Sequence, residues 1–256
     1  MAGTSPAMTI WRLMTELRIG CSGWAYKDWR GPFYPPEVRV KDHLAFYASQ
    51  FDTAEINASF YRLPTEKAVA AWRDAVPEGF VFAWKASRYL THNKKLNDPK
   101  DSLELIVSRM APLGDRFGPI LFQLPPSLRL DRERLAAFLD LLPKDRRATV
   151  EFRHPSWYAP EVFQLLEAHD VALCISDHHD APSPWEVTAS FVYVRAHGPG
   201  GRYHGRYGEA ELNTLAHAID GWRKAGKAVF CYFDNDIKSA APRDAKLLVG
   251  KLAGTS

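Results

Sequence analysis

The sequence lacks the features that mark secreted, membrane-bound or metal-thiolate proteins. Its three cysteines, Cys21, Cys174 and Cys231, lie far apart in apolar runs and without metal-type spacing, as expected of reduced core residues. No apolar run reaches the roughly 18 residues that a membrane span requires. The N-terminal residues 1–17 contain no apolar segment followed by a small-residue cleavage site, so no signal peptide is expected. We therefore expect a cytoplasmic protein without a membrane partner, with residues 1–17 as a loose N-terminal extension.

The sequence also has only a small excess of positive charge and lacks a nucleotide-binding glycine motif. The net charge is +3, which is too small to argue for nucleic-acid binding by itself. No G-x-G-x-x-G motif follows the first strand-like run, which disfavours a dinucleotide-binding sheet. Apolar residues make up 46% of the chain and charged residues 25%, as is typical of a globular protein with a large core.

What the sequence does contain is a regular alternation of strand-like and helix-like segments. Residues 80–87 (FVFAWKAS) alternate apolar and mixed side chains as a strand does, while Thr65 opens one helix-like segment and Asp131 caps another. The expected strands are 18–24, 53–57, 80–87, 119–125, 147–154, 172–177, 191–198 and 228–236. The expected helices are 41–50, 65–76, 101–113, 131–142, 160–169, 209–224 and 240–252. A polar loop is expected over 88–99, and a Pro-rich connection without a clear helix after residue 177.

This alternation predicts the fold class. Strands that alternate with helices form a parallel sheet, because each helix carries the chain back across the sheet. Eight such units within a chain of 256 residues favour a closed (β/α)8 TIM barrel over an open sheet. No linker interrupts the pattern, so we expect a single domain over residues 18–253.

Polar side chains gather at the carboxyl ends of the predicted strands, where such barrels carry their active sites. The segment TVEFRHPSW (149–157) shows the pattern: Val150 and Phe152 share one face of the strand, and Glu151 and Arg153 share the other. The same alternation in the other strands predicts a convergent inward set, consisting of Glu55, Asn57, Lys85, Gln123, Glu151, Arg153, Asp177, Arg195, His197 and Asp234. Part of the set has a structural interpretation, such as an ion pair between Lys85 and Glu55 that closes the barrel top.

Two chemistries fit the inward set. Glu151, Asp177, His197 and Asp234 end four consecutive strands and offer oxygen and nitrogen ligands, so a divalent metal is a candidate cofactor. Arg153 and Arg195 share the inner face, however, and guanidinium groups suit phosphate or carboxylate. Cations beside a metal make sense when an anionic substrate bridges the two.

Further candidates lie in the loops after the strands. The segment HGPGGRYHGRYG (197–208) is rich in glycine and carries Arg202 and Arg206, and such loops after the seventh strand often bind phosphate in barrels. The alternative is a surface loop without a ligand. Aromatic residues that could stack on a base or a sugar, or could form a packed lid, are Trp24, Tyr26, Trp29, Phe60, Tyr61, Trp157, Tyr203 and Tyr207. The pair His178-His179 is a weaker candidate for metal binding.

Seven collinear segments give the chain a family resemblance. They are GCSGWAYKDWRGPFYP, AEINASFYRLP, FAWKASRYLTH, FQLPPS, VEFRHPSW, VYVRAHG and YFDND. Together they resemble the YecE-like family, also called domain of unknown function 72, over essentially residues 18–252. The resemblance implies a (β/α)8 barrel and no particular reaction. It marks as site positions Glu55, Asn57, Lys85, Gln123, Glu151, Arg153, Arg195, His197, Asn235 and Asp236. The family usually has asparagine where this chain has Asp234, which argues against an obligatory metal ligand there.

Three functional hypotheses follow. The first is an enzyme, possibly a hydrolase of phosphoesters, that acts on an anionic, phosphate-bearing substrate such as a nucleotide or nucleic acid. In it Arg153, Arg195 and the glycine-rich loop bind the anion, Glu151 is a general base or metal ligand, and His197 or Lys85 donates a proton. The second is a sugar-handling enzyme with Glu55 and Glu151 as a carboxylate pair. The third is a non-catalytic module that binds a metabolite or nucleic acid. The substrate, the metal and the oligomeric state stay open.

Overall fold

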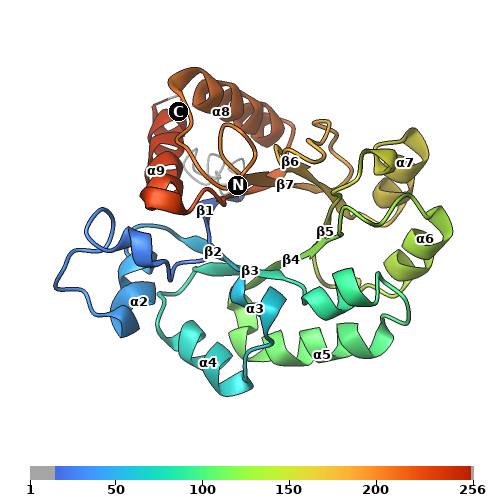
Figure 1. Ribbon diagram of the computed structural model, residues 1–256, viewed down its shortest axis with the longest axis horizontal. Coiled ribbons are helices and arrows are strands. Elements are labelled where there is room, and N and C mark those ends of the chain that lie inside the picture. The colour runs from blue at the N-terminus through green and yellow to red at the C-terminus, as the bar shows by residue number, and fades with distance from the viewer. Residues whose placement is uncertain (1–14, 255–256) are drawn as a thin grey trace, which may run out of the picture.

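The computed structural model describes residues 15–254, and they form a closed barrel of parallel strands. The strands follow one another around the barrel in chain order, and the last pairs with the first (Figure 1). They are β1 (Leu17–Ser22), β2 (Thr53–Ile56), β3 (Val81–Lys85), β4 (Phe117–Gln123), β5 (Ala148–Glu151), β6 (Ala172–Ser176), β7 (Phe191–Ala196) and β8 (Ala228–Phe233). The predicted (β/α)8 TIM barrel is confirmed.

Helices surround the strands on the outside (Figure 1). They are α2 (His43–Ala48), α3 (Ala58–Tyr61), α4 (Glu66–Asp74), α5 (Lys100–Met110), α6 (Arg132–Asp140), α7 (Pro160–Ala168), α8 (Glu209–Lys224) and α9 (Ala240–Ala253). The connection between β6 and β7 contains no helix among the described residues, as its prolines predict. Within residues 15–254, no helix is both long enough and apolar enough to cross a membrane.

Side-chain oxygens begin two of the helices at the predicted residues. The Thr65 hydroxyl accepts a hydrogen bond from the backbone N–H of Ala68, and the Asp131 carboxylate accepts one from Arg134. Each bond satisfies one of the N–H groups that the first turn of a helix leaves without a partner. The two helices therefore start where these polar residues stand.

The strand alternation divides the interior into two apolar layers. Outward-facing residues such as Phe82, Trp84 and Val150 pack against the helices in the main core. Inward-facing residues such as Leu121, Tyr193 and Tyr232 fill the lower part of the barrel. At the carboxyl ends of the strands the inward positions become polar and charged. The barrel is thus packed below and polar above, and the polar end is its mouth.

Two segments near the mouth differ from the prediction. The loop after β3 contains a π-helix, Tyr89–Asn93, where the polar sequence predicted no regular structure. A short helix, α3, follows β2 directly and carries Tyr61 at its end. Both segments are short and lack the apolar periodicity that identifies a longer helix, so sequence patterns do not reveal them. The π-helix matters for the site, because such turns are frequent near functional residues.

Candidate functional site

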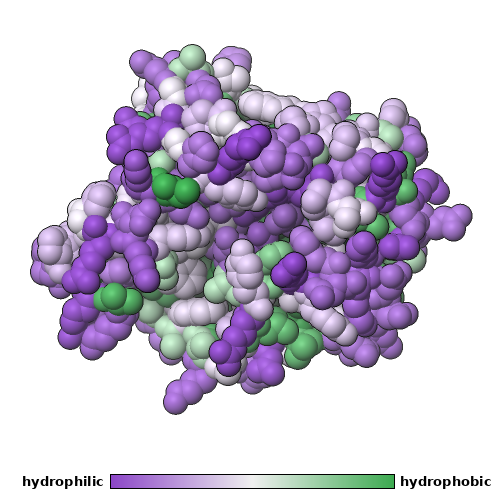
Figure 2. Space-filling view, viewed as in Figure 1, coloured by the Kyte–Doolittle hydropathy of each residue, from purple (hydrophilic) through white to green (hydrophobic). Residues whose placement is uncertain are grey.

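The mouth of the barrel faces the viewer in Figures 1 and 2, with α3 in front. Figure 2 shows hydrophilic residues around the hollow over the middle of this face. The predicted inward residues of six strands are buried beneath it, namely Glu55, Lys85, Gln123, Glu151, Arg195 and Asp234. The structure therefore brings these side chains together, as the strand alternation predicts.

Arg195 is the centre of this cluster and has no solvent-exposed surface. Its Nε and Nη2 atoms donate to Glu55, its Nη1 donates to Glu151 at 2.9 Å, and its Nη2 donates to Asp234 at 2.6 Å. Further contacts reach the Ser22 hydroxyl at 3.0 Å and His197 Nε2 at 3.1 Å. All the donors of Arg195 are thus directed at protein groups. Its predicted role in binding a substrate anion stays a prediction, because an anion could bind Arg195 only if these contacts rearranged.

Arg153 neutralises the other side of Glu151. Its Nε and Nη2 atoms lie 2.7 and 2.6 Å from Glu151 Oε1, and its Nη1 donates to the Tyr203 hydroxyl at 3.0 Å. Burial alone would raise the pKa of Glu151, but Arg153 and Arg195 outweigh it and hold this pKa well below its usual range. Glu151 is therefore a stable carboxylate and a weak base at neutral pH.

His197 lies between these cations and Asp177. Its Nε2 atom is 3.1 Å from nitrogens of both Arg153 and Arg195, so it must accept hydrogen bonds. Its Nδ1 faces Asp177 at 3.3 Å and Ser176 at 3.4 Å, and therefore carries the proton. A neutral ring held in this way has no proton to give at Nε2.

The four predicted metal ligands do not converge on one point. Asp177 lies beside Nδ1 of His197, whereas Glu151 and Asp234 lie 3.6 Å from Nε2 on the other side of the ring. The guanidinium of Arg195 occupies the space between the two carboxylates. A cation there would meet a fixed positive charge, so this arrangement does not favour the metal interpretation.

A different trio meets the distance requirement for a metal. Among the described residues, only His178, His179 and Asp180 place three ligand atoms of these types within 4.8 Å of one another. Burial and the nearby charge of Arg153 lower the pKa of His178 to about 3, which keeps its ring neutral. The same positive charge opposes binding of a cation.

The ammonium of Lys85, at the end of β3, has no carboxylate partner among the described residues. It lies 4.4 Å from the centre of the Phe60 ring, and no hydrogen bond or ion pair joins it to any described residue. The predicted ion pair with Glu55 does not form, because Glu55 binds Arg195 instead. Burial and the charge of Arg195 lower the pKa of Lys85 to about 8. Only 6% of the residue is exposed.

Lys85 belongs to a group of cations around His92 on the π-helix. Burial and the charges of Lys85, Arg88 and Arg153 lower the pKa of His92 to about 4. Neither Lys85 nor Arg88 has a carboxylate within 4.0 Å among residues 15–254. We call this side of the mouth the cation cluster (Lys85, Arg88, His92 and Arg153). Arg153 is paired with Glu151 and His92 is neutral at pH 7, so the charge that no described carboxylate contacts is that of Lys85 and Arg88.

The remaining predicted polar residues differ in where they lie: two are near the mouth, and one holds a loop in place. Gln123 ends β4 at the mouth and is buried. Asn57 follows β2, and its buried Oδ1 has no hydrogen-bond partner among the described residues. Asn235 donates to the Gly205 carbonyl and to Asp244, so it fixes the loop after β7 to α9.

The aromatic residues divide between the lid and the core. Tyr61 is 78% exposed at the rim, and Tyr203 covers Arg153, so both are open to a ligand. Trp157 is buried in the outer core, where its ring stacks on Phe152 at 4.7 Å and its Nε1 donates to the Leu128 carbonyl. The predicted stacking role of Trp157 therefore has no support in the structure. Its indole fills the shell between barrel and helices.

The glycine-rich loop after β7 is packed against the loop after β6. The Gly201 carbonyl accepts a hydrogen bond from His179 N–H, and Tyr203 N–H donates to the His197 carbonyl at 2.6 Å. Several backbone amides of the loop that is predicted to bind an anion are thus hydrogen-bonded within the protein. The side chains of Arg202 and Arg206 are exposed at the rim. Their predicted role in anion binding stays a prediction.

Two polar residues of the mouth, Ser22 and Ser176, escaped the sequence reasoning. Ser22 at the end of β1 contacts both Glu55 and Arg195, and Ser176 at the end of β6 donates to Glu151 at 3.2 Å. Both occupy inward positions, so strand parity could have found them. In β6 the same parity places Ser176 inward, and the prediction that Asp177 belongs to the buried inward set is wrong, because Asp177 is exposed beyond the end of the strand. Asp236, which the family resemblance already marked, is half-buried, and desolvation followed by the like charge of Asp234 raises its pKa to about 9. It is therefore a protonated acid at neutral pH.

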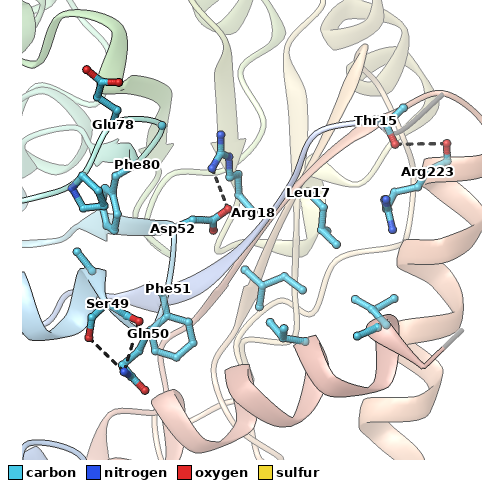
Figure 3. A pocket seen from close by; sticks show the side chains of 17 residues that line it. Thr15, Leu17, Arg18, Ser49, Gln50, Phe51, Asp52, Glu78, Phe80 and Arg223 are labelled. Carbon is cyan, nitrogen blue, oxygen red and sulfur yellow. Dashed lines mark hydrogen bonds and ion pairs between the residues drawn. The ribbon is translucent and has the colours of Figure 1, made fainter. Parts of the chain in front are cut away.

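A separate cavity lies at the opposite end of the barrel. It measures about 840 Å³ and is lined by residues at or just before the amino ends of the strands, including Leu17, Asp52 and Phe80 (Figure 3). Arg18 donates to Asp52 across it at 2.8 Å. Catalytic residues of such barrels come from the carboxyl ends of the strands, so we place the candidate site at the mouth and not in this cavity.

Comparison with known proteins gives the chain its family. UPF0759 protein YunF of Bacillus subtilis is 26% identical over 90% of this chain and 93% of its own length. UPF0759 protein YecE of Escherichia coli K12 is 32% identical over 55% of this chain and 50% of its own length. The crystal structure of a DUF72 family protein from Thermotoga maritima has a TM-score of 0.85 at 26% identity and covers 93% of this chain and 99% of that one. The family model described as "Protein of unknown function DUF72" matches residues 18–256, and the chain belongs to that family.

Proposed function

We propose that the protein is an enzyme that binds an anionic, phosphate-bearing substrate at the mouth of the barrel. The observation that carries the proposal is the cation cluster, in which Lys85 and Arg88 lack a carboxylate partner among the described residues. Lys85 is buried and Arg88 is exposed. A buried cation without a carboxylate partner attracts an anion strongly, because little water screens its charge, and Arg88 adds a more screened attraction. Phosphate suits such a group, since its oxygens accept several charged hydrogen bonds at once.

Lys85 is the residue best suited to proton transfer in this proposal. Its pKa of about 8 lies close to neutral pH, where an acid–base group works most efficiently. Glu151 is held as a carboxylate and His197 has no proton at Nε2, so both serve to position Arg153 and Arg195. The general-base role predicted for Glu151 is therefore replaced in the proposal by a role for Lys85.

The geometry gives less support to a sugar-handling site. A carboxylate pair for glycoside cleavage needs one protonated acid and one free carboxylate. Glu55 and Glu151 both bind Arg195, and the pKa of Glu151 is held well below its usual range. Neither carboxylate is free for that chemistry in this arrangement.

Phosphate binding and turnover test the proposal together. We would titrate inorganic phosphate by calorimetry and assay phosphomonoesters, phosphodiesters, nucleotides and abasic DNA, each with and without divalent metal ions. Lys85→Met and Arg88→Met should each weaken phosphate binding by about 10- to 150-fold, because each removes one charged contact worth about 1.5–3 kcal/mol. Lys67→Met is the control, since Lys67 is exposed on α4.

The outcomes separate the hypotheses. Turnover of one ester class that is lost in Lys85→Met supports the enzyme. Phosphate binding that both variants weaken, without turnover of any ester, supports the non-catalytic binding module in place of the enzyme. Phosphate affinity that is equal in wild type, Lys85→Met and Arg88→Met overturns the proposal.

A further inference from the structure

Lys85 has surroundings that suit a nucleophilic amine. Most charged groups of the mouth are tied to an opposite charge, as Arg195 and Arg153 are. The Lys85 ammonium contacts the face of Phe60 and has no hydrogen bond or ion pair with any residue of the described chain. An ammonium that is shielded from water and lacks a carboxylate at contact distance is poorly stabilised in its charged form.

The lowered pKa makes the neutral amine available. With a pKa of about 8, about one Lys85 side chain in ten is unprotonated at pH 7, compared with fewer than about one in a thousand for an ordinary lysine. Neutral lysine amines desolvated in this way are the nucleophiles that form Schiff bases with carbonyl compounds. Lys85 also ends strand β3 at the mouth, the part of such barrels that supplies reacting groups.

The cation cluster would hold a second group of the same ligand. Arg88 follows Lys85 by three residues, and both act with Arg153 on His92, so a phosphate held by Arg88 would lie on the same side of the mouth as the Lys85 amine. Arg153 could join such a phosphate only by releasing a bond to Glu151, Tyr203 or His197. Tyr61 and Tyr203 flank this part of the mouth. A ligand with a phosphate at one end could therefore present a carbonyl group at the other.

We propose that Lys85 forms an imine with the carbonyl carbon of a phosphate-bearing aldehyde or ketone. The inference rests on the proposed function, because it names the class of anionic substrate that the mouth would take. It assigns to Lys85 a covalent role in addition to charge, and no residue of the carboxylate cluster is needed as nucleophile.

The step balances without an external oxidant or reductant. The lone pair of the Lys85 nitrogen forms a bond to the carbonyl carbon, and the electron pair of the C=O double bond moves to the oxygen. A proton passes from nitrogen to oxygen, and solvent supplies a second proton to that oxygen. The oxygen leaves as water, and the nitrogen lone pair forms the C=N bond of a protonated imine.

Trapping with pyridoxal 5′-phosphate tests the proposal, because this probe carries both an aldehyde and a phosphate. The full chain would be treated with a stoichiometric amount of probe at pH 7, reduced with borohydride, digested and mapped by mass spectrometry. We expect one pyridoxyl group, on Lys85, and at least a tenfold lower yield on exposed lysines such as Lys67. Inorganic phosphate should reduce the yield at Lys85 but not at Lys67.

Variants make the result specific to Lys85. Lys85→Arg retains the positive charge but cannot form the imine, so its adduct should be lost while phosphate binding is kept. Lys67→Arg should leave the Lys85 adduct unchanged. Thermal melting of each variant confirms that it is folded before labelling.

Two failures are distinguishable. If wild type binds phosphate but its labelling is spread over exposed lysines with no preference for Lys85, the imine is refuted and the proposed anion site stands. If Lys85 is labelled selectively and phosphate neither binds nor competes, the amine is confirmed as a nucleophile and the phosphate-binding function fails.

Discussion

At the scale of the residue, Arg195 determines how the charges of the barrel mouth are arranged. Its guanidinium binds three buried carboxylates from β2, β5 and the end of β8, namely Glu55, Glu151 and Asp234. Three carboxylates in a space without water would repel one another strongly if no cation stood between them. The contribution of Arg195 is therefore mainly to prevent that repulsion.

Removal of Arg195 should destabilise the protein severely. Arg195→Met leaves the carboxylates without their shared cation, and loss of one member of a buried ion pair costs about 3–5 kcal/mol of unfolding free energy. Urea denaturation at pH 7 measures this loss. Arg39→Met removes a pair with Asp42 whose side chains are 68% and 42% exposed, and it should cost less than about 1 kcal/mol. Equal effects of the two changes would contradict the central role of Arg195.

At the scale of the element, the loop between β7 and α8 depends on close contact with the loop after β6. Gly201 has φ of +63°, and a Cβ atom there would overlap the Asp177 carbonyl oxygen and lie 2.5 Å from His179 N. Its neighbour Gly200 has open space where a Cβ would be. The glycine at 201 therefore lets the two loops touch, and this contact holds Tyr203 over Arg153.

The two glycines provide a matched pair of substitutions. Gly201→Ala should lower the unfolding free energy by about 1–3 kcal/mol, because the loop must move away from the backbone that it contacts. Gly200→Ala should change it by less than about 0.5 kcal/mol. Thermal and urea unfolding measure both variants. A Gly201→Ala protein as stable as Gly200→Ala would show that the two loops are not in contact in solution.

At the scale of the whole molecule, the charges of the mouth couple folding to pH. The folded state holds the pKa of Glu151 well below its value of 4.5 in the unfolded chain, because Arg153 and Arg195 outweigh the effect of burial. A depressed carboxyl pKa contributes stability that is present above pH 4.5 and is lost as the pH falls toward the folded value. The protein should therefore lose stability in acid.

The unfolding free energy measured between pH 7 and pH 3 tests this coupling. Wild type should fall steeply below pH 4.5, whereas Glu151→Gln should start lower at pH 7 and fall less steeply, because it has no proton to take up at this position. Glu37→Gln, at an exposed position, should follow the wild-type curve. If the unfolding free energy of Glu151→Gln fell with pH as steeply as that of wild type, the acid sensitivity would come from other carboxylates.

The sequence pattern predicted the positions of some side chains correctly and of others wrongly. Strand parity predicted that Glu151 and Arg153 point inward, and both are buried at the mouth. The same reasoning offered Glu55 as an ion-pair partner for Lys85, and that pair does not form, because Glu55 binds Arg195. Trp157 was placed at the mouth because it follows a strand end, but a 3-10 turn over Pro155–Trp157 directs it into the outer core.

Local sequence patterns were sufficient to predict the order of strands and helices, the closed barrel and, except in β6, the inward or outward side of the residues named above. These features follow from periods of two and 3.6 residues, which are properties of the local chain. Only the tertiary structure decided which charges pair. Arg195 reaches Glu55 across 140 positions of sequence, and this choice leaves Lys85 without a carboxylate partner among the described residues. Pairing depends on barrel closure and side-chain reach, which bring distant strand ends within hydrogen-bonding distance.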